Sequence, residues 1–122
     1  MPAIPVISII DDDPSVRAAT SNLLRSFGYV VHTFDSAEAF LQSPQLSETS
    51  CAVVDVRMPA MSGLEMQAHL RANGNGQPLI FITALPDASA RTRAFAAGAS
   101  GFLTKPFDKD GLIGCIDSAL SR

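Results

Sequence analysis

The chain has 122 residues, enough for one domain with a buried core. Hydrophobic residues make up 47% of it and charged residues 17%, a composition that excludes a disordered chain. The formal net charge of −3 argues against direct binding to nucleic acid or to an anionic membrane, and no apolar run approaches the roughly 20 residues that cross a bilayer.

The first third of the chain alternates strand and helix patterns. The continuous apolar run at 6–10 predicts a strand that is buried on both faces. Apolar residues then recur at helical spacing from Val16 to Phe27, and Gly28 ends this helix. Residues 29–34 are expected to form the second strand.

The next segment contains a short helix and a third strand. Asp35 followed by Glu38 predicts a capping box that opens a helix ending at Leu41. Residues 43–50 are polar and contain a proline, which indicates a loop. Residues 51–54 are apolar and predict the third strand.

Two further units follow the third strand. Residues 63–71 suit a helix, which the sequence NGNG at 73–76 ends. Residues 79–82 predict the fourth strand. The pattern therefore repeats strand and helix in regular alternation.

The last third of the chain continues the alternation. Alanines at helical spacing over 90–97 predict a helix with a small-residue face, ended by Gly98. Residues 102–103 predict a short fifth strand. A wide apolar stripe over 112–120 predicts the final helix, with Asp108 as its N-cap.

Five strand–helix units without an internal repeat or a linker predict one α/β domain over residues 1–122. Its parallel sheet should be covered by helices on both faces, with right-handed crossovers. Ligands of such sheets bind beyond the carboxyl ends of the strands, at the topological switch point. Five residues lie just past predicted strands and are therefore candidate site residues: Asp11, Asp12, Asp55, Thr83 and Lys105.

Three consecutive aspartates follow the first strand in the sequence IIDDDP at 9–14. Asp13 precedes a proline that suits a first helical turn, so we interpret it as the N-cap of the first helix. Asp11 and Asp12 remain at the strand exit, level with Asp55 on the neighbouring strand, and three carboxylates around one hollow suit Mg²⁺. For Asp11 and Asp12 alone, a solvated acidic rim explains the pair equally well; Asp55 and the other strand-end residues favour a functional site.

Four motifs resemble the receiver domain of two-component response regulators. They are IIDDD at 9–13, VVDVRMPAMSGLE at 53–65, FITA at 81–84 and AFAAGASGFLTKPF at 94–107, in the family's order. The resemblance implies a flavodoxin-like, doubly wound sheet of five parallel strands in the order 2-1-3-4-5, with five helices. The residues of these motifs are most similar to those of the FixJ-type branch, whose receivers commonly precede a DNA-binding domain. No output domain is expected in this chain, so it is either a stand-alone receiver or part of a transcription regulator.

The resemblance implies a role for each acidic residue. Asp55 would be the phosphoacceptor and would take a phosphoryl group from the phosphohistidine of a sensor histidine kinase. Asp12 and Asp55 would bind Mg²⁺ directly, together with the main-chain carbonyl of Arg57. Asp11 would bind the ion directly or through water.

The resemblance also implies a charge partner and a switch. Lys105 would contact a phosphoryl oxygen, aimed by a cis bond to Pro106. Thr83 would be the switch hydroxyl and Phe102 the switch aromatic. Phosphorylation would then alter the surface at about 87–120, which controls a partner, an output domain or a homodimer. The domain would catalyse only its own phosphorylation and dephosphorylation, and is otherwise not expected to be an enzyme.

Three other functions fit the sequence less well. An aspartyl-phosphate phosphatase of the haloacid dehalogenase type requires a second acidic residue two positions after the nucleophile, where this chain has Arg57. A flavin-binding module would need a phosphate-binding loop where this chain has carboxylates. A receiver that has lost phosphorylation would not be expected to keep the Asp55, Thr83 and Lys105 set.

The two cysteines bear on the cellular compartment. Cys51 and Cys115 have no neighbouring cysteine or histidine in metal-ligand spacing. We interpret both as buried free thiols of a cytoplasmic protein, since reducing conditions favour unpaired thiols. The N-terminus lacks the basic and apolar segments of a signal peptide, which agrees with this interpretation.

Overall fold

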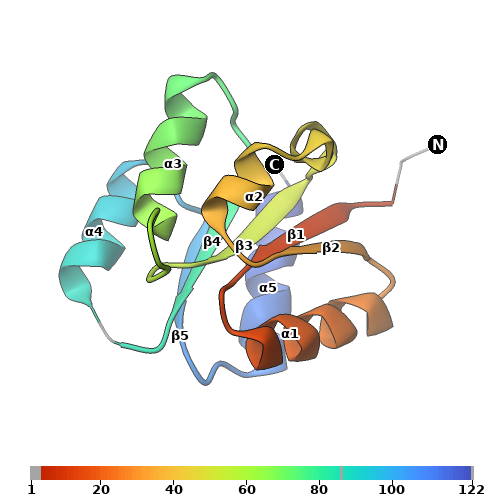
Figure 1. The fold of residues 1–122 in the computed structure, drawn as a ribbon. Helices are drawn as coiled ribbons and strands as arrows, with labels where there is room; N and C mark the ends of the chain where they lie inside the picture. The colour runs from red at the N-terminus through yellow and green to blue at the C-terminus, as the bar shows by residue number, and fades with distance from the viewer. Residues whose placement is uncertain (1–3, 86, 122) are drawn as a thin grey trace.

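The fold is a parallel sheet of five strands with helices on both faces (Figure 1). The computed structural model describes residues 4–85 and 87–121. The strand order is β2-β1-β3-β4-β5, which confirms the predicted flavodoxin-like arrangement. The strands are β1 (Val6–Ile10), β2 (Val30–Phe34), β3 (Cys51–Asp55), β4 (Leu79–Thr83) and β5 (Gly101–Thr104).

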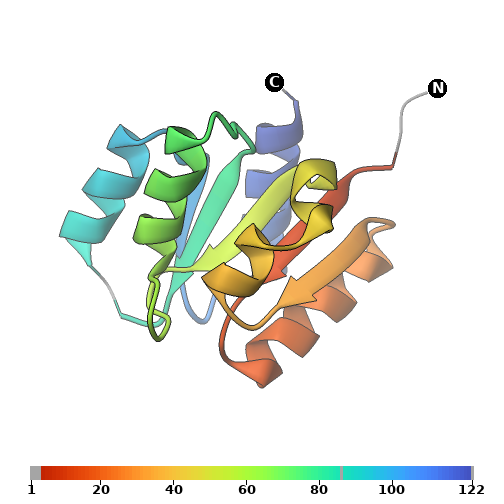
Figure 2. The same ribbon diagram turned by 45° about the horizontal axis from the view of Figure 1, so that its top comes forward.

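The helices divide between the two faces of the sheet (Figure 2). On one face lie α2 (Ala37–Leu41), α3 (Gly63–Ala72) and α4 (Ala88–Ala96). On the other face lie α1 (Pro14–Ser26) and α5 (Lys109–Leu120). In the described part of the chain, no helix has the length and apolar character that a membrane crossing requires.

The central strands are buried on both sides. All residues of β3 and β4 are buried, and alternate residues of each strand enter the two separate cores. On β3, for example, Val54 packs with α2, α3 and α4, whereas Val53 packs with α1 and α5. This double coverage explains why these strands are continuous apolar runs.

Two of the predicted helix caps are confirmed. The carboxylate of Asp13 accepts hydrogen bonds from the backbone N–H of Ser15 at 2.9 Å and of Val16 at 3.4 Å. The carboxylate of Asp108 accepts one from the N–H of Gly111 at 2.7 Å. Asp13 is therefore occupied in capping α1, which separates it from the other two aspartates of the run.

The predicted capping box at α2 is wrong. The N-cap is Ser36, whose hydroxyl oxygen accepts from the N–H of Ala39 at 3.1 Å. Because the helix begins one residue later than predicted, its third residue is Ala39 rather than Glu38, and an alanine cannot return the second hydrogen bond of a capping box.

The segment predicted to be a loop at 43–50 contains a short 3₁₀ helix, η1 (Pro44–Glu48). The hydroxyl oxygen of Ser43 accepts from the N–H of Gln45 at 3.0 Å, and Pro44 stands at the first helical position. A serine cap followed by a proline with its restricted φ is enough to start one tight turn.

The interpretation of both cysteines as buried is wrong for one of them. Cys51 on β3 is buried, whereas Cys115 on α5 is only partly buried; both are free thiols. Cys115 packs beside Gly101 of β5, the strand at one edge of the sheet.

Candidate functional site

Three carboxylates meet where β1 and β3 end. Ile10 pairs with Val54 in the parallel register, so Asp11 and Asp55 leave the neighbouring strands β1 and β3 at the same level. One oxygen from each of Asp11, Asp12 and Asp55 lies within 4.8 Å of the others. Asp11 and Asp55 are buried and Asp12 is exposed, so the cluster opens to solvent on one side. The structure thus brings Asp11, Asp12 and Asp55 together at the carboxyl ends of the strands, where the sequence predicted them.

Lys105 provides the cationic group of the cluster. Its ammonium nitrogen, Nζ, lies 3.0 Å from Oδ2 of Asp11 and 3.5 Å from Oδ2 of Asp55. The backbone N–H of Lys105 donates to the carbonyl of Thr83 at 2.7 Å, which ties the residue to the end of β4. The bond between Lys105 and Pro106 is cis, as the resemblance implied.

The cluster carries more negative charge than one lysine offsets. Burial raises the pKa of Asp55 to about 6, and the charge of Asp11 adds to this rise. The charge of Lys105 and the N–H of Arg57, which donates to Oδ1 of Asp55 at 3.3 Å, act in the opposite direction. Burial also disfavours the charged form of Lys105, but its hydrogen bond to Asp11 and the charges of Asp11 and Asp55 outweigh this and raise its pKa.

The donor set fits a divalent cation. Carboxylate oxygens are the ligands that Mg²⁺ prefers, and the open side of the cluster leaves room for the waters that it retains. A cation among the three carboxylates would offset the negative charge of Asp11, which together with burial raises the pKa of Asp55. Asp11, Asp12 and Asp55 are thus brought together, while ligation by the carbonyl of Arg57 stays a prediction.

The two predicted switch residues lie on neighbouring strands, with Thr83 at the end of β4 and Phe102 within β5. Thr83 is fully buried, and its hydroxyl donates to the carbonyl of Leu85 at 3.1 Å while accepting from the Leu85 N–H at 3.3 Å. The hydroxyl is therefore held by its own loop. Phe102 is half-buried and packs against Phe81, with a distance of 6.3 Å between the ring centroids.

Sequence reasoning missed the role of Gly63. A Cβ atom added there would lie 2.5 Å from the main-chain oxygen of Asp55, so only glycine allows α3 to begin this close to the site. Ser62 and Glu65 form a capping box at the same place, with hydrogen bonds of 3.1 and 3.0 Å. The spacing of Ser62 and Glu65 was a readable signal for this helix start. Contact with Asp55, by contrast, has no local signature.

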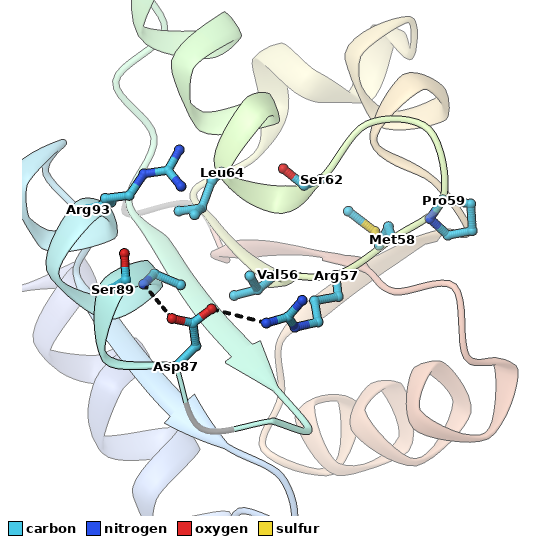
Figure 3. A pocket seen from close by; sticks show the side chains of 10 residues that line it. Val56, Arg57, Met58, Pro59, Ser62, Leu64, Asp87, Ser89 and Arg93 are labelled. Atoms are coloured by element: carbon cyan, nitrogen blue, oxygen red, sulfur yellow. Dashed lines mark hydrogen bonds and ion pairs between the residues drawn. The ribbon is translucent and has the colours of Figure 1, made fainter.

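Sequence reasoning also missed an ion pair next to the site. Nη2 of Arg57 lies 3.0 Å from Oδ2 of Asp87, the N-cap of α4. The pair lies in a hollow of about 480 Å³ between the loop after β3 and the start of α4 (Figure 3). Since 30 positions separate the two residues, no local pattern announces their contact.

Comparison with known proteins gives consistent matches over nearly the whole chain. The sequence model of the response regulator receiver domain matches residues 7–117. The response regulator protein TodT of Pseudomonas putida is 45% identical over 115 residues, which cover 94% of this chain and 51% of TodT. The chain spans about half the length of the curated relatives it matches.

Solved structures give the same result. The response regulator StyR superposes with a TM-score of 0.90 at 45% identity, covering 98% of this chain and 60% of StyR. The crystal structure of FixJ-N superposes with a TM-score of 0.88 at 32% identity, covering 100% of this chain and 97% of FixJ-N. The similarity therefore extends to the complete fold described above.

Proposed function

Because the chain belongs to the response regulator receiver domain family of two-component systems, we propose that it accepts a phosphoryl group on Asp55 from a sensor histidine kinase. One observation carries this proposal. Asp55 ends the central strand β3 with two other carboxylates and the ammonium group of Lys105 around it, within reach of solvent. This arrangement combines a nucleophile with the charges needed to hold a phosphoryl group.

The proposed reaction is a transfer between a histidine and Asp55. A carboxylate oxygen of Asp55 attacks the phosphorus of the phosphohistidine; a P–O bond forms, the P–N bond breaks, and its electron pair returns to the imidazole nitrogen. Lys105, 3.5 Å from Asp55, would balance the charge of a phosphoryl oxygen. With the pKa of Asp55 at about 6, most molecules carry the reactive carboxylate at neutral pH.

Magnesium is proposed as the cofactor of this transfer. Asp11, Asp12 and Asp55 would hold the ion, with the main-chain carbonyl of Arg57 as a further ligand. When bound, Mg²⁺ supplies positive charge for the phosphoryl oxygens during transfer. The close approach of the three carboxylates, within 4.8 Å of one another, supports this proposal.

Thr83 and Phe102 are proposed to carry the signal from Asp55. The hydroxyl of Thr83 would exchange its hydrogen bonds with Leu85 for one to a phosphoryl oxygen, and Phe102 would turn into the space released. The half-buried position of Phe102 beside Phe81 supports such a movement, because the ring is not locked in the core. The altered surface at about 87–120 would then bind a partner, an output domain or a second copy.

The wider role is also a proposal. The domain would catalyse only its own phosphorylation and dephosphorylation, and it would not contact DNA itself. Two curated relatives that are named transcriptional regulatory protein FixJ are longer than this chain, which covers 58% and 57% of them; this favours the receiver part of a transcription regulator over a stand-alone receiver. Arg57, at the position where a haloacid dehalogenase phosphatase wants an acid, disfavours that alternative. The expected cytoplasmic location stays a prediction.

Intact mass spectrometry tests the proposed phosphorylation. The chain is incubated with acetyl phosphate and Mg²⁺, and a gain of about 80 Da is expected. Asp55→Asn should gain nothing, and chelation with EDTA should suppress the gain in the wild type. A wild-type chain that never gains this mass, or an Asp55→Asn variant that gains it equally, would refute the assignment of Asp55.

A further inference from the structure

We propose that the ion pair between Arg57 and Asp87 is a latch that holds the N-terminal end of α4 in its unphosphorylated position. A phosphoryl group on Asp55 opens this latch by attracting the guanidinium group of Arg57 away from Asp87. The opening step rests on the proposed phosphorylation of Asp55. The latch in the unphosphorylated chain rests on the contacts alone.

Arg57 connects the phosphoacceptor to α4. Its backbone N–H donates to Oδ1 of Asp55 at 3.3 Å, while its guanidinium group lies 3.0 Å from Asp87. The side chain of Arg57 is 57% exposed, so solvent surrounds it and it can rotate between partners. One residue therefore contacts Asp55 through its backbone and the start of α4 through its side chain.

Asp87 divides its two oxygens between two tasks. Oδ1 accepts from the N–H of Ala90 at 3.0 Å and caps α4, whereas Oδ2 binds Arg57 (Figure 3). Loss of Arg57 from Oδ2 leaves the cap in place. Opening the latch therefore frees the start of α4 without unwinding the helix.

The other contacts of α4 leave its first turn weakly held. The buried residues of α4 are the small side chains of Ala90 and Ala94. Near the C-terminal end of the helix, the buried Gln67 donates through Nε2 to the carbonyls of Ala94 at 3.1 Å and Ala97 at 3.4 Å. One end of α4 is thus fixed by a buried amide and the other by an exposed ion pair, so α4 should pivot about the Gln67 end.

A phosphoryl group at Asp55 would compete with Asp87 for Arg57. It carries about −1.5 to −2 charges in place of the single charge of the Asp55 carboxylate, two residues from Arg57, against the single charge of Asp87. A guanidinium group also matches phosphoryl oxygens geometrically, with two parallel hydrogen bonds. The ion pair with Asp87 is exposed and therefore weak enough to be exchanged.

Hydrogen exchange of the α4 backbone tests the latch in the unphosphorylated chain. Asp87→Asn keeps a good N-cap but removes the charge, and Arg57→Gln removes the other partner. Each variant should accelerate exchange of the first exchangeable amides of α4 by about two- to fivefold, the factor that an exposed ion pair is worth. The amides of α5 should not change.

Arg93 provides a matched control from the same hollow. It also carries one positive charge, and among the residues that the structure describes it makes no ion pair. Figure 3 shows its side chain extending from α4 toward Leu64, away from Asp87. Arg93→Gln should therefore leave α4 exchange as in the wild type. Unchanged exchange in both Asp87→Asn and Arg57→Gln would overturn the latch.

A second arm tests the opening by phosphorylation. Phosphorylated wild type should show α4 exchange close to that of unphosphorylated Asp87→Asn, and phosphorylation should add little in that variant. The double variant Arg57→Gln with Asp87→Asn should show no further acceleration beyond either single change. A mass gain of about 80 Da without any change at α4 would refute the latch alone, whereas no mass gain would refute the proposed function and leave the first arm readable.

Discussion

The helices α4 and α5 lie against opposite faces of the same end of the sheet, and they are held there by different means (Figure 2). α5 buries Leu112, Ile116 and Ala119 in its core. α4 buries Ala90 and Ala94. Burial of apolar surface stabilises roughly in proportion to its area, so α5 gains far more from its contact with the sheet than α4 does.

Polar contacts replace this burial at α4. The amide of Gln67 binds its last turn, and Arg57 binds its N-cap. Such contacts are directional and can be exchanged for others, whereas a packed apolar face has no equivalent alternative partner. The loop that contains Lys105 therefore leads into the firmly packed helix α5. The weakly packed helix α4 instead contacts Arg57, the residue two positions after Asp55.

The largest expected effect tests the apolar attachment of α5. Ile116→Ala should lower the free energy of unfolding by about 3 kcal/mol, because it removes a fully buried side chain and leaves a cavity. Denaturant unfolding measures the loss. The matched change Ala94→Gly on α4 should cost about 1 kcal/mol. A loss below about 1 kcal/mol for Ile116→Ala would contradict strong apolar attachment of α5.

The charge of Asp55 should affect the stability of the whole domain rather than that of α4 or α5 alone, because Asp55 ends the central strand β3. Its folded pKa of about 6 lies above the ordinary value of 3.8, so the folded state binds the proton more tightly than the unfolded state does. This contribution to stability is complete below about pH 4 and is lost as the pH rises through about 6.

Asp55→Asn removes this titration. In EDTA it should raise the free energy of unfolding on the order of 2 kcal/mol at about pH 7.5 and leave it nearly unchanged at about pH 4. Thermal or denaturant unfolding at the two pH values measures the difference, and Mg²⁺ should stabilise the wild type more than the variant. An equal gain at both pH values would show that desolvated charge is not the cause.

Gln67→Leu sharpens the comparison at the far end of α4. The change keeps the volume but removes the hydrogen bonds to Ala94 and Ala97, and should cost about 1 kcal/mol. Hydrogen exchange should accelerate in the last turn of α4 and remain unchanged in α5. Acceleration in both helices would instead indicate a general loss of stability.

The smallest expected effect compares the two aspartate caps. Asp108→Asn at α5 should change the free energy of unfolding by no more than a few tenths of a kcal/mol, because asparagine caps equally well. Asp87→Asn at α4 also keeps the cap but loses the pair with Arg57, and should cost up to about 1 kcal/mol. Thermal unfolding of the two variants measures the difference. Equal losses of stability in the two variants would show that the ion pair with Arg57 does not stabilise α4.

Much of this could be read from the sequence, and the errors have physical reasons. Continuous apolar runs marked the buried strands, and Asp13 before Pro14 marked a cap, because these patterns act within a few residues. The parallel register then had to bring Asp11 level with Asp55. The order of the strands came from the resemblance, since apolar runs do not say which strands are neighbours.

The errors at α2 and η1 arose because neighbouring residues in each segment favour different local structures. Asp35 and Ser36 are both good caps, and the start of the helix selected Ser36 because its hydroxyl reaches the N–H of Ala39. At 43–50 the polar composition outweighed the serine and proline that start a 3₁₀ turn. In each segment the residues that start the helix were present in the sequence, but the prediction relied on a different local pattern.

The sequence by itself determined the sheet, its covering helices and the set of acidic and basic residues at the strand ends, because periodicity and strand termination are local properties. Only the tertiary structure decided that Arg57 reaches Asp87 and that Gly63 lies against the carbonyl of Asp55. These contacts depend on how closely separate units of the chain pack, and packing distance is a property of the assembled core rather than of any one segment.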